Sequence, residues 1–240
     1  AKQVIEQVTQ EAIREKRIRD MVEELPDNLT PEEKQAIAAH NLEIEEALKI
    51  TKGKPMTVEQ ADQQHANPNY GKKYEYSINC QTCAPAYVLR LMGFNVTAKA
   101  NTKNSLSEYL SRQRSFEAWK NTDGSPAVPT LTYDWMIAKG YKQMSKKRYA
   151  EYFEECCKET GVYILTIGWK GGGGHATVLQ RFEDGTLKYI EPQVYSERSG
   201  AKRSIDELCE SGATKPYPKR GVLRVDNKLF DTKFASIFDK

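Results

Sequence analysis

The sequence has 240 residues, of which 39% are hydrophobic and 29% are charged, so it can form one large domain or one domain with an appendage. No run of eighteen apolar residues occurs, which excludes a typical membrane-spanning helix, and the charged first twenty residues do not resemble a secretory signal. The net charge is +3, but residues 1–50 contain 12 acidic and 7 basic residues, a balance of −5 that leaves +8 for the rest. The basic residues are scattered and not interleaved with aromatic residues, so nucleic-acid binding is not indicated.

The first segment is predicted to be helical. Residues 2–24 lack Gly and Pro and place apolar residues near a 3.6-residue period, and a second helix is predicted from Pro31 to about Ile50. Thr30, Pro31 and Glu33 form a strong start signal for that helix, and Thr57 begins a second capping box before a short helix. We predict a helical N-terminal extension over residues 1–56, acting as a linker, an oligomerising arm or a region packed on a compact domain over residues 57–240.

Further helices are predicted within that domain, over residues 84–92, 104–119, 133–138 and 146–159. The composition then becomes β-branched and aromatic, which predicts strands over residues 162–169, 175–182, 186–193 and 221–225. Asp184 and Gly185 indicate a tight hairpin between the second and third of these strands. Helices followed by an antiparallel sheet indicate an α+β fold.

The five cysteines are too few for a small disulfide scaffold, so we predict reduced thiols in a cytosol. Cys80 and Cys83 are three residues apart, a spacing with several interpretations. A zinc site would need further ligands, and no second Cys-x-x-Cys or His pair supplies them. A thioredoxin-like pair would need a βαβ unit, which the predicted order of elements lacks. The remaining alternatives are two buried structural thiols or a nucleophile at a helix start.

A nucleophilic thiol is favoured at a helix N-terminus, because unpaired N–H groups and the helix dipole stabilise the thiolate. It also needs a base, and His175 is the best candidate of three histidines because it begins a strand directly after Gly171–Gly174. We expect His40 to be a solvated or packing residue, and His65 lies in a polar loop. The glycines would leave room for a substrate, or would form only a flexible turn.

A group that orients the histidine is expected from the neighbouring strand. If Asp184 and Gly185 form the hairpin tip, Glu191 and Gln193 return to the same end of the hairpin as His175. Glu191 is the better candidate because a carboxylate stabilises an imidazolium, although a surface glutamate would fit the same position.

Two segments carry a resemblance to a known family. NCQTCAPAYVLRLMGFNVTA, residues 79–98, resembles the N-C-x-x-C-x-x-A-x-x-x-R-x-x-G-x-x-V-x-A signature of the papain-fold toxin family. GGHATVLQRFEDGTLKYIEPQ, residues 173–193, resembles the glycine-His strand of that family and its following Asp-Pro-Gln. The resemblance covers roughly residues 57–195. Similar domains lie at the C-terminal end of the minor head proteins of Mu-like phages.

The resemblance implies a papain-like fold with Cys80 as nucleophile, His175 as base and Glu191 as orienting group. Glu191 replaces the aspartate of the family pattern, and the glutamine of the papain oxyanion hole has no counterpart upstream. Asn79, Gln81, Gln193 or backbone N–H groups would then stabilise the oxyanion or orient the histidine.

The choice between the two thiols stays open. Cys80 is favoured because Ala84, four residues later, is small enough to lie beneath a reactive thiol. Cys83 is the alternative nucleophile, since Pro85 fits more easily if the helix begins near Thr82, and Cys-x-x-Cys-Ala is a papain-like spacing.

The resemblance implies a protein glutamine deamidase acting as a toxin or effector, and a cysteine peptidase would use the same residues. No cofactor or metal is needed. Expected partners are a bacterial host protein as substrate, an immunity protein, and phage head or portal proteins, in the bacterial cytosol or the phage particle. The non-enzymatic alternative is a phage head module that only binds.

Overall fold

The computed structural model describes residues 1–194 and 204–240, apart from the side chains of residues 63 and 64. It confirms the α+β class. The helices are α1 (Lys2–Glu24), α2 (Pro31–Leu48), α3 (Val58–Ala61), α4 (Gln63–Ala66), α5 (Cys80–Met92), α6 (Leu106–Ser111), α7 (Thr132–Ala138), α8 (Lys146–Cys156) and α9 (Ile205–Ser211). Short 3-10 helices are η1 (Tyr74–Tyr76), η2 (Ser115–Ala118) and η3 (Thr232–Ile237).

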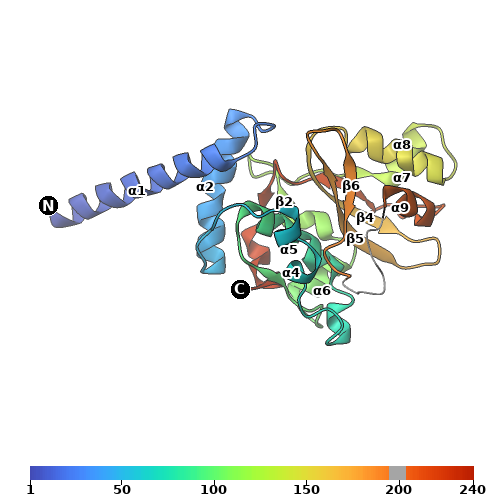
Figure 1. Ribbon diagram of the computed structural model, residues 1–240, viewed down its shortest axis with the longest axis horizontal. Coiled ribbons are helices and arrows are strands. Elements are labelled where there is room, and N and C mark those ends of the chain that lie inside the picture. Colours follow the sequence, from blue (N-terminus) through green and yellow to red (C-terminus); the bar gives the residue numbers. More distant parts are fainter. Residues whose placement is uncertain (195–203) are drawn as a thin grey trace.

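A five-stranded antiparallel sheet forms the centre of the molecule (Figure 1). Its order is β3 (Thr130–Leu131), β7 (Gly221–Arg224), β4 (Gly161–Gly168), β5 (Gly174–Arg181) and β6 (Leu187–Ile190). Two small sheets pair β1 (Thr97–Ala98) with β9 (Phe238–Asp239), and β2 (Trp119–Lys120) with β8 (Leu229–Phe230).

The central sheet is covered on both faces. On β4, Ile164 lies in a core with the helix α5 residue Val88, whereas its neighbour Leu165 lies in a second core with Phe153 of α8. This division follows from the pleat, which directs successive side chains to opposite faces. Every residue of β4 is buried, as its continuous apolar run predicts for a central strand. Helix α5 is therefore held against the sheet by a continuous core.

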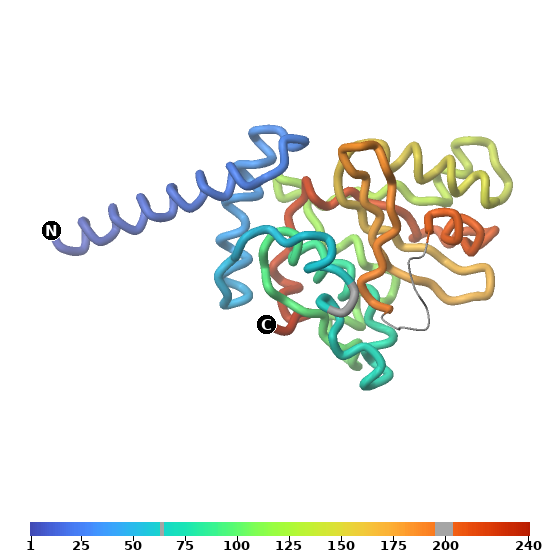
Figure 2. The backbone as a smooth tube through the Cα atoms, viewed as in Figure 1, coloured from blue at the N-terminus to red at the C-terminus, as the bar shows by residue number. Residues whose placement is uncertain are grey.

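The two N-terminal helices have different environments. Residues 2–16 of α1 are exposed, and the helix extends away from the rest of the chain (Figure 2). Helix α2 instead contributes Ile44 and Leu48 to the core that contains α5. This packing is one of the three arrangements considered for the extension, while the boundary at residue 56 stays a prediction. Within the described residues, no helix is both long and apolar enough to cross a membrane.

Several predicted elements have different bounds. The helix predicted over residues 104–119 is wrong for much of its length, because α6 ends at Ser111 and is followed by η2 and β2. Gln113 interrupts it with a φ of 61°, a conformation incompatible with a right-handed helix. Helix α5 begins at Cys80, earlier than the predicted start at residue 84. Pro85 is therefore the sixth residue of the helix, where it lacks the N–H that would donate to the Gln81 carbonyl.

Candidate active site

Cys80 is the first residue of α5, and the residue is half-buried. Asn79 precedes it as the N-cap residue, but its side chain does not cap the helix. Its Nδ2 atom instead donates to Oδ1 of Asn67 at 3.0 Å and to the Lys99 carbonyl at 3.0 Å. In the described part of the chain, the backbone N–H groups of Cys80 and Gln81 donate no hydrogen bond. These are the first N–H groups of a helix, which have no intrahelical acceptor.

His175 and Glu191 come from the two strands of the predicted hairpin. Val178 of β5 pairs with Ile190 of β6, so Glu191 directly follows β6 at the end where β5 begins. The Nε2 atom of His175 lies 2.7 Å from Oε2 of Glu191. Both side chains are buried, with relative exposures of 8% and 1%. The sequence-based pairing of these two residues is therefore present in the structure.

The Glu191 carboxylate is surrounded by donors. The Tyr189 hydroxyl donates to the same oxygen, Oε2, that contacts His175. The backbone N–H groups of Gln193 and Val194 donate to Oε1 at 3.2 and 3.3 Å. Burial raises the pKa of Glu191, but the charge and hydrogen bond of His175, the Tyr189 hydroxyl and the Val194 N–H lower it by more. Glu191 is consequently ionised and held in one orientation.

Cys80 and His175 form a coupled pair. Burial raises the pKa of the Cys80 thiol, but hydrogen bonding and charge attraction from His175, with the Ala176 N–H, bring it below its ordinary value. Burial lowers the pKa of His175, whereas the Glu191 charge and the contacts with Cys80 raise it to about 10. Since Nε2 of His175 faces Glu191, the other ring nitrogen is left for the sulfur. The arrangement favours a thiolate beside an imidazolium.

The second thiol of the Cys-x-x-Cys pair has a different environment. Cys83 is fully buried, and its pKa is raised well above the ordinary value by burial and by the charges of Cys80 and Glu191. No interaction with His175 offsets that rise. Cys83 packs in the core beside Ala84 and Tyr87, as a small apolar residue would. The structure brings Cys80, and not Cys83, to the histidine.

Three other candidate residues surround this pair. Gln81 is buried, and its Nε2 atom donates to the Ser107 carbonyl at 2.9 Å, while its Oε1 lies 3.7 Å from the Cys80 sulfur. Gln193 donates from Nε2 to Oδ1 of Asn79 at 3.4 Å. The Asn79 amide N–H groups are already used by Asn67 and Lys99. The unpaired backbone N–H groups of Cys80 and Gln81 are thus better placed as oxyanion donors than the Asn79 amide.

A pocket of about 260 Å³ opens over Cys80 and His175. The residues that line it are Ser77, Ile78, Cys80, Gln81, Ser111, Gln113, Ser115, Gly174, His175, Ala176, Gln193 and Arg220.

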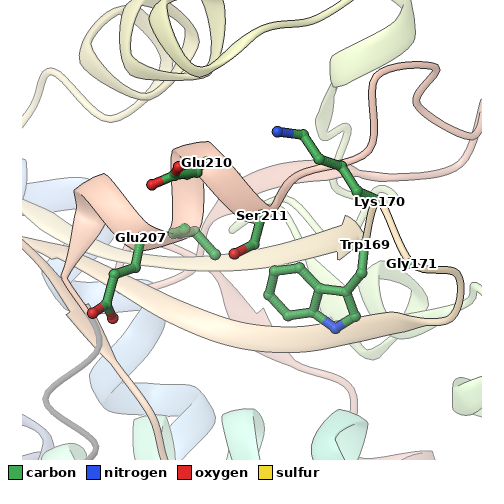
Figure 3. Close-up of a pocket in the computed structure, with 7 residues that line it drawn as sticks. Trp169, Lys170, Gly171, Glu207, Glu210 and Ser211 are labelled. Atoms are coloured by element: carbon green, nitrogen blue, oxygen red, sulfur yellow. The ribbon is translucent and has the colours of Figure 1, made fainter.

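Trp169 lies beside the histidine. Its indole ring stacks on the His175 imidazole, with centroids 5.9 Å apart and planes at 27°. The same residue lines a second pocket of about 690 Å³, together with the β4–β5 turn and α9 (Figure 3). Figure 3 shows the indole lying below Ser211, the last residue of α9, with Glu207 and Glu210 earlier in the same helix. Trp169 therefore restricts the movement of His175 and shields one face of its ring.

The residues that the structure describes supply no further ligands for a zinc site. Within residues 1–194 and 204–240, no group of three or more His, Cys, Asp or Glu side chains is placed to hold a metal ion. His40 contacts Glu43 and the Phe230 carbonyl through its two ring nitrogens. His65 is exposed and belongs to α4. Neither histidine lines the pocket over Cys80.

Comparisons with protein-family models, curated proteins and solved structures found no match.

Several residues of the site were missed from the sequence. Tyr189 could have been found, because it precedes Glu191 by two residues and so lies on the same strand face. Asn67 carried no such signal: it lies in a loop, yet its buried Nδ2 donates to the carbonyls of Tyr76 and Gln193, both at 3.1 Å. Arg220 likewise carried no signal, because it lies far along the sequence from each of the motifs described above.

Proposed function

We propose that this chain is a cysteine hydrolase of papain-like fold that acts on a carboxamide or peptide carbonyl of a protein substrate. The observation that carries the proposal is the Cys80 thiol, whose pKa is lowered by a histidine that Glu191 holds through Nε2. The chain order supports the papain-like fold, since a cysteine at a helix N-terminus precedes a histidine and an acid on an antiparallel sheet.

The proposed reaction begins with attack of the Cys80 thiolate on the carbonyl carbon. The carbonyl oxygen becomes an oxyanion, which the backbone N–H groups of Cys80 and Gln81 would stabilise. The His175 imidazolium then gives its proton to the departing ammonia or amine, and a thioester with Cys80 remains. His175 next removes a proton from water, which attacks the thioester and releases the carboxylic acid with the thiol restored. Glu191 keeps the imidazole oriented through both steps.

Glutamine deamidation is our first choice for the reaction. The sequence resemblance suggests it, and the pocket size is compatible with it. At about 260 Å³, the pocket is smaller than typical sites for drug-sized ligands and suits one side chain. Proteolysis by the same residues is the alternative. The proposed substrate is a bacterial host protein, and an immunity protein that covers the pocket would fit a toxin.

The experiment compares the wild type with Cys80→Ala after incubation with bacterial extract. Deamidation converts glutamine to glutamate and adds about one dalton to a peptide, whereas proteolysis creates new chain ends. We expect the mass change to require Cys80. Cys83→Ala is the matched control, since it removes a thiol from the same helix, and it should retain the activity. Equal modification by wild type and Cys80→Ala would reject the thiol mechanism.

A binding role in a phage particle is favoured by one observation. Helix α1 exposes Val4, Ile5 and Val8 at the start of a segment that extends from the body, as an assembly arm would. A harmless wild-type protein that still enters phage particles would support this role over the enzymatic one.

A further inference from the structure

Arg220 is a charged residue of the pocket that the proposed reaction leaves without a role. It directly precedes β7 and lines the pocket together with Cys80 and His175. Its guanidinium lies against Gly174, so a Cβ atom at residue 174 would collide with Nη2 of Arg220 and lie 3.0 Å from Nη1. Gly174 therefore makes space for Arg220, whereas the sequence suggested that this glycine makes space for substrate.

The guanidinium has no protein acceptor in the part of the chain that the structure describes. No hydrogen bond or ion pair of its side chain occurs there, and its Nε atom is buried without a partner. Burial lowers the pKa of Arg220, and attraction to Cys80 partly opposes that effect. Arginine nonetheless stays charged in proteins, and unpaired buried donors are rare because they lose their hydrogen bonds to water. A ligand that supplies an acceptor would remove this cost.

The charge of the pocket indicates which class of ligand would bind Arg220. Its lining contains Arg220 and His175 but no Asp or Glu. His175 and Arg220 carry two positive charges, and the Cys80 thiolate and Glu191 carry two negative charges, so the charges of the site balance as a whole. The Glu191 carboxylate contacts His175 and does not line the pocket, so the Arg220 guanidinium has no carboxylate to bind among the described residues of the lining. A planar guanidinium is well suited to bind a carboxylate through two parallel hydrogen bonds.

We propose that Arg220 is a specificity residue that binds a carboxylate of the substrate beside the carbonyl attacked by Cys80. The carboxylate belongs either to an acidic side chain next to the target residue or to a chain terminus. This inference rests on the proposed function, since it assumes that substrate occupies the pocket over Cys80.

Two alkylating reagents test the inference without a known substrate. Iodoacetate carries a carboxylate and iodoacetamide is neutral, while both react with a thiolate. The ratio of their rate constants at Cys80, read by fragment mass spectrometry, reports the charge that guides the reagent. We expect Arg220→Gln to lower the iodoacetate-to-iodoacetamide ratio about tenfold, a change of about 1.4 kcal/mol.

Lys219→Gln is the matched control. It removes one positive charge at the neighbouring exposed residue, which does not line the pocket. We expect its ratio to equal that of the wild type. Equal losses in both variants, or no loss in either, would overturn the inference. If Arg220→Gln does not fold, the salt dependence of the wild-type ratio replaces it: the ratio should fall as salt screens the guanidinium, and a salt-independent ratio would overturn the proposal.

Two small molecules that carry a carboxylate distinguish a chain terminus from an acidic side chain as the source of the bound group. N-acetylglutamine carries a terminal carboxylate and N-acetylglutamate α-amide a side-chain carboxylate. Protection of Cys80 from iodoacetamide by either one, lost in Arg220→Gln, supports the inference and identifies the source; failure of both to protect counts against it.

The two proposals fail in different ways. If neither reagent modifies Cys80 faster than Cys156, whose pKa is raised to about 11, the proposed function fails. If both reagents react rapidly with Cys80 and the ratio of their rate constants is the same in wild type and Arg220→Gln, only the specificity role fails.

Discussion

Oε2 of Glu191 lies 2.7 Å from Nε2 of His175, in a site where both side chains are almost fully buried. Glu191→Gln keeps the size of the side chain but removes the charge that raises the pKa of His175. The imidazolium then becomes less favourable, and with it the Cys80 thiolate. We expect the pH midpoint of Cys80 alkylation by iodoacetamide to rise, and the rate at pH 7 to fall about tenfold or more.

A direct effect acts in the opposite direction, because the Glu191 charge itself raises the pKa of Cys80. That effect is smaller than the contribution of His175, so the midpoint should still rise. Glu183→Gln, at the exposed tip of the same hairpin, is the control and should not change the midpoint. A midpoint unchanged in Glu191→Gln would show that the carboxylate does not act on the thiol through the histidine.

Tyr189→Phe tests whether the hydroxyl acts through Glu191. The hydroxyl donates to the Glu191 oxygen that contacts His175, and loss of a hydrogen bond to a charged group costs about 1.5–3 kcal/mol. We expect a fall in alkylation rate smaller than that of Glu191→Gln. The double variant should react no more slowly than Glu191→Gln alone, because the hydroxyl then has no carboxylate to support. Fully additive losses would place Tyr189 in a separate role.

The two thiols of α5 should respond differently to substitution. Cys80→Ala should abolish rapid alkylation and activity, since the sulfur is the proposed nucleophile. Cys83→Ala should leave both within about threefold of wild type and lower the free energy of unfolding by about 1 kcal/mol, because it removes one buried core atom. Denaturant unfolding and alkylation kinetics measure these effects. Loss of activity in Cys83→Ala with unchanged stability would reverse the assignment.

The stability of Cys80→Ala should depend on pH through His175. In the wild type, the Glu191 charge and hydrogen bond raise the pKa of His175 against the opposing effect of burial. We expect them to keep this pKa above its ordinary 6.5 in the variant, so that the folded state binds more protons than the unfolded state above that pH. The stabilisation is therefore complete below about pH 6.5 and is lost as pH rises toward the folded pKa. We expect the free energy of unfolding to fall as the pH rises above about 6.5. Adding Glu191→Gln should flatten this slope, and a slope that persists would assign the titration to another group.

Asn67→Ala tests how the loop before α5 is connected to the segment that follows β6 and contains Glu191. The Asn67 amide bridges the Asn79 side chain and the Gln193 carbonyl, and its loss leaves buried groups unpaired. We expect the free energy of unfolding to fall by about 2–3 kcal/mol and Cys80 alkylation to slow. Asn69→Ala, in the same loop but partly exposed, should have less than half this effect on stability. Equal effects would attribute the loss to the loop as a whole.

The parts of the site that could be predicted are those governed by local rules. Asp184 and Gly185 indicate a hairpin, and strand alternation then places Glu191 near His175, as the structure shows. The position of the two cysteines at the start of a predicted helix likewise indicated a reactive thiol. The choice of Cys80 over Cys83 depended on where α5 begins, and local propensity did not decide that position around Pro85.

The unpredicted parts depend on contacts between distant segments. Asn67 lies 126 residues from Gln193, and Arg220 approaches Gly174 from the position directly before β7. The small strands near the C-terminus were missed for the same reason: β8 and β9 are only two residues long and form by pairing with β2 and β1. No periodicity exists over so short a length, and only the packed core determines the pairing.

The absence of a side chain at Gly174 has a consequence for how such a protein can diverge. Its φ lies outside the left-handed region, so the backbone would accept alanine there, and the obstacle is the neighbouring guanidinium. One methyl group would displace Arg220 from its present position while leaving Cys80, His175 and Glu191 in place. On the proposed role of Arg220, a single codon change would therefore alter which targets are recognised and preserve the proposed reaction.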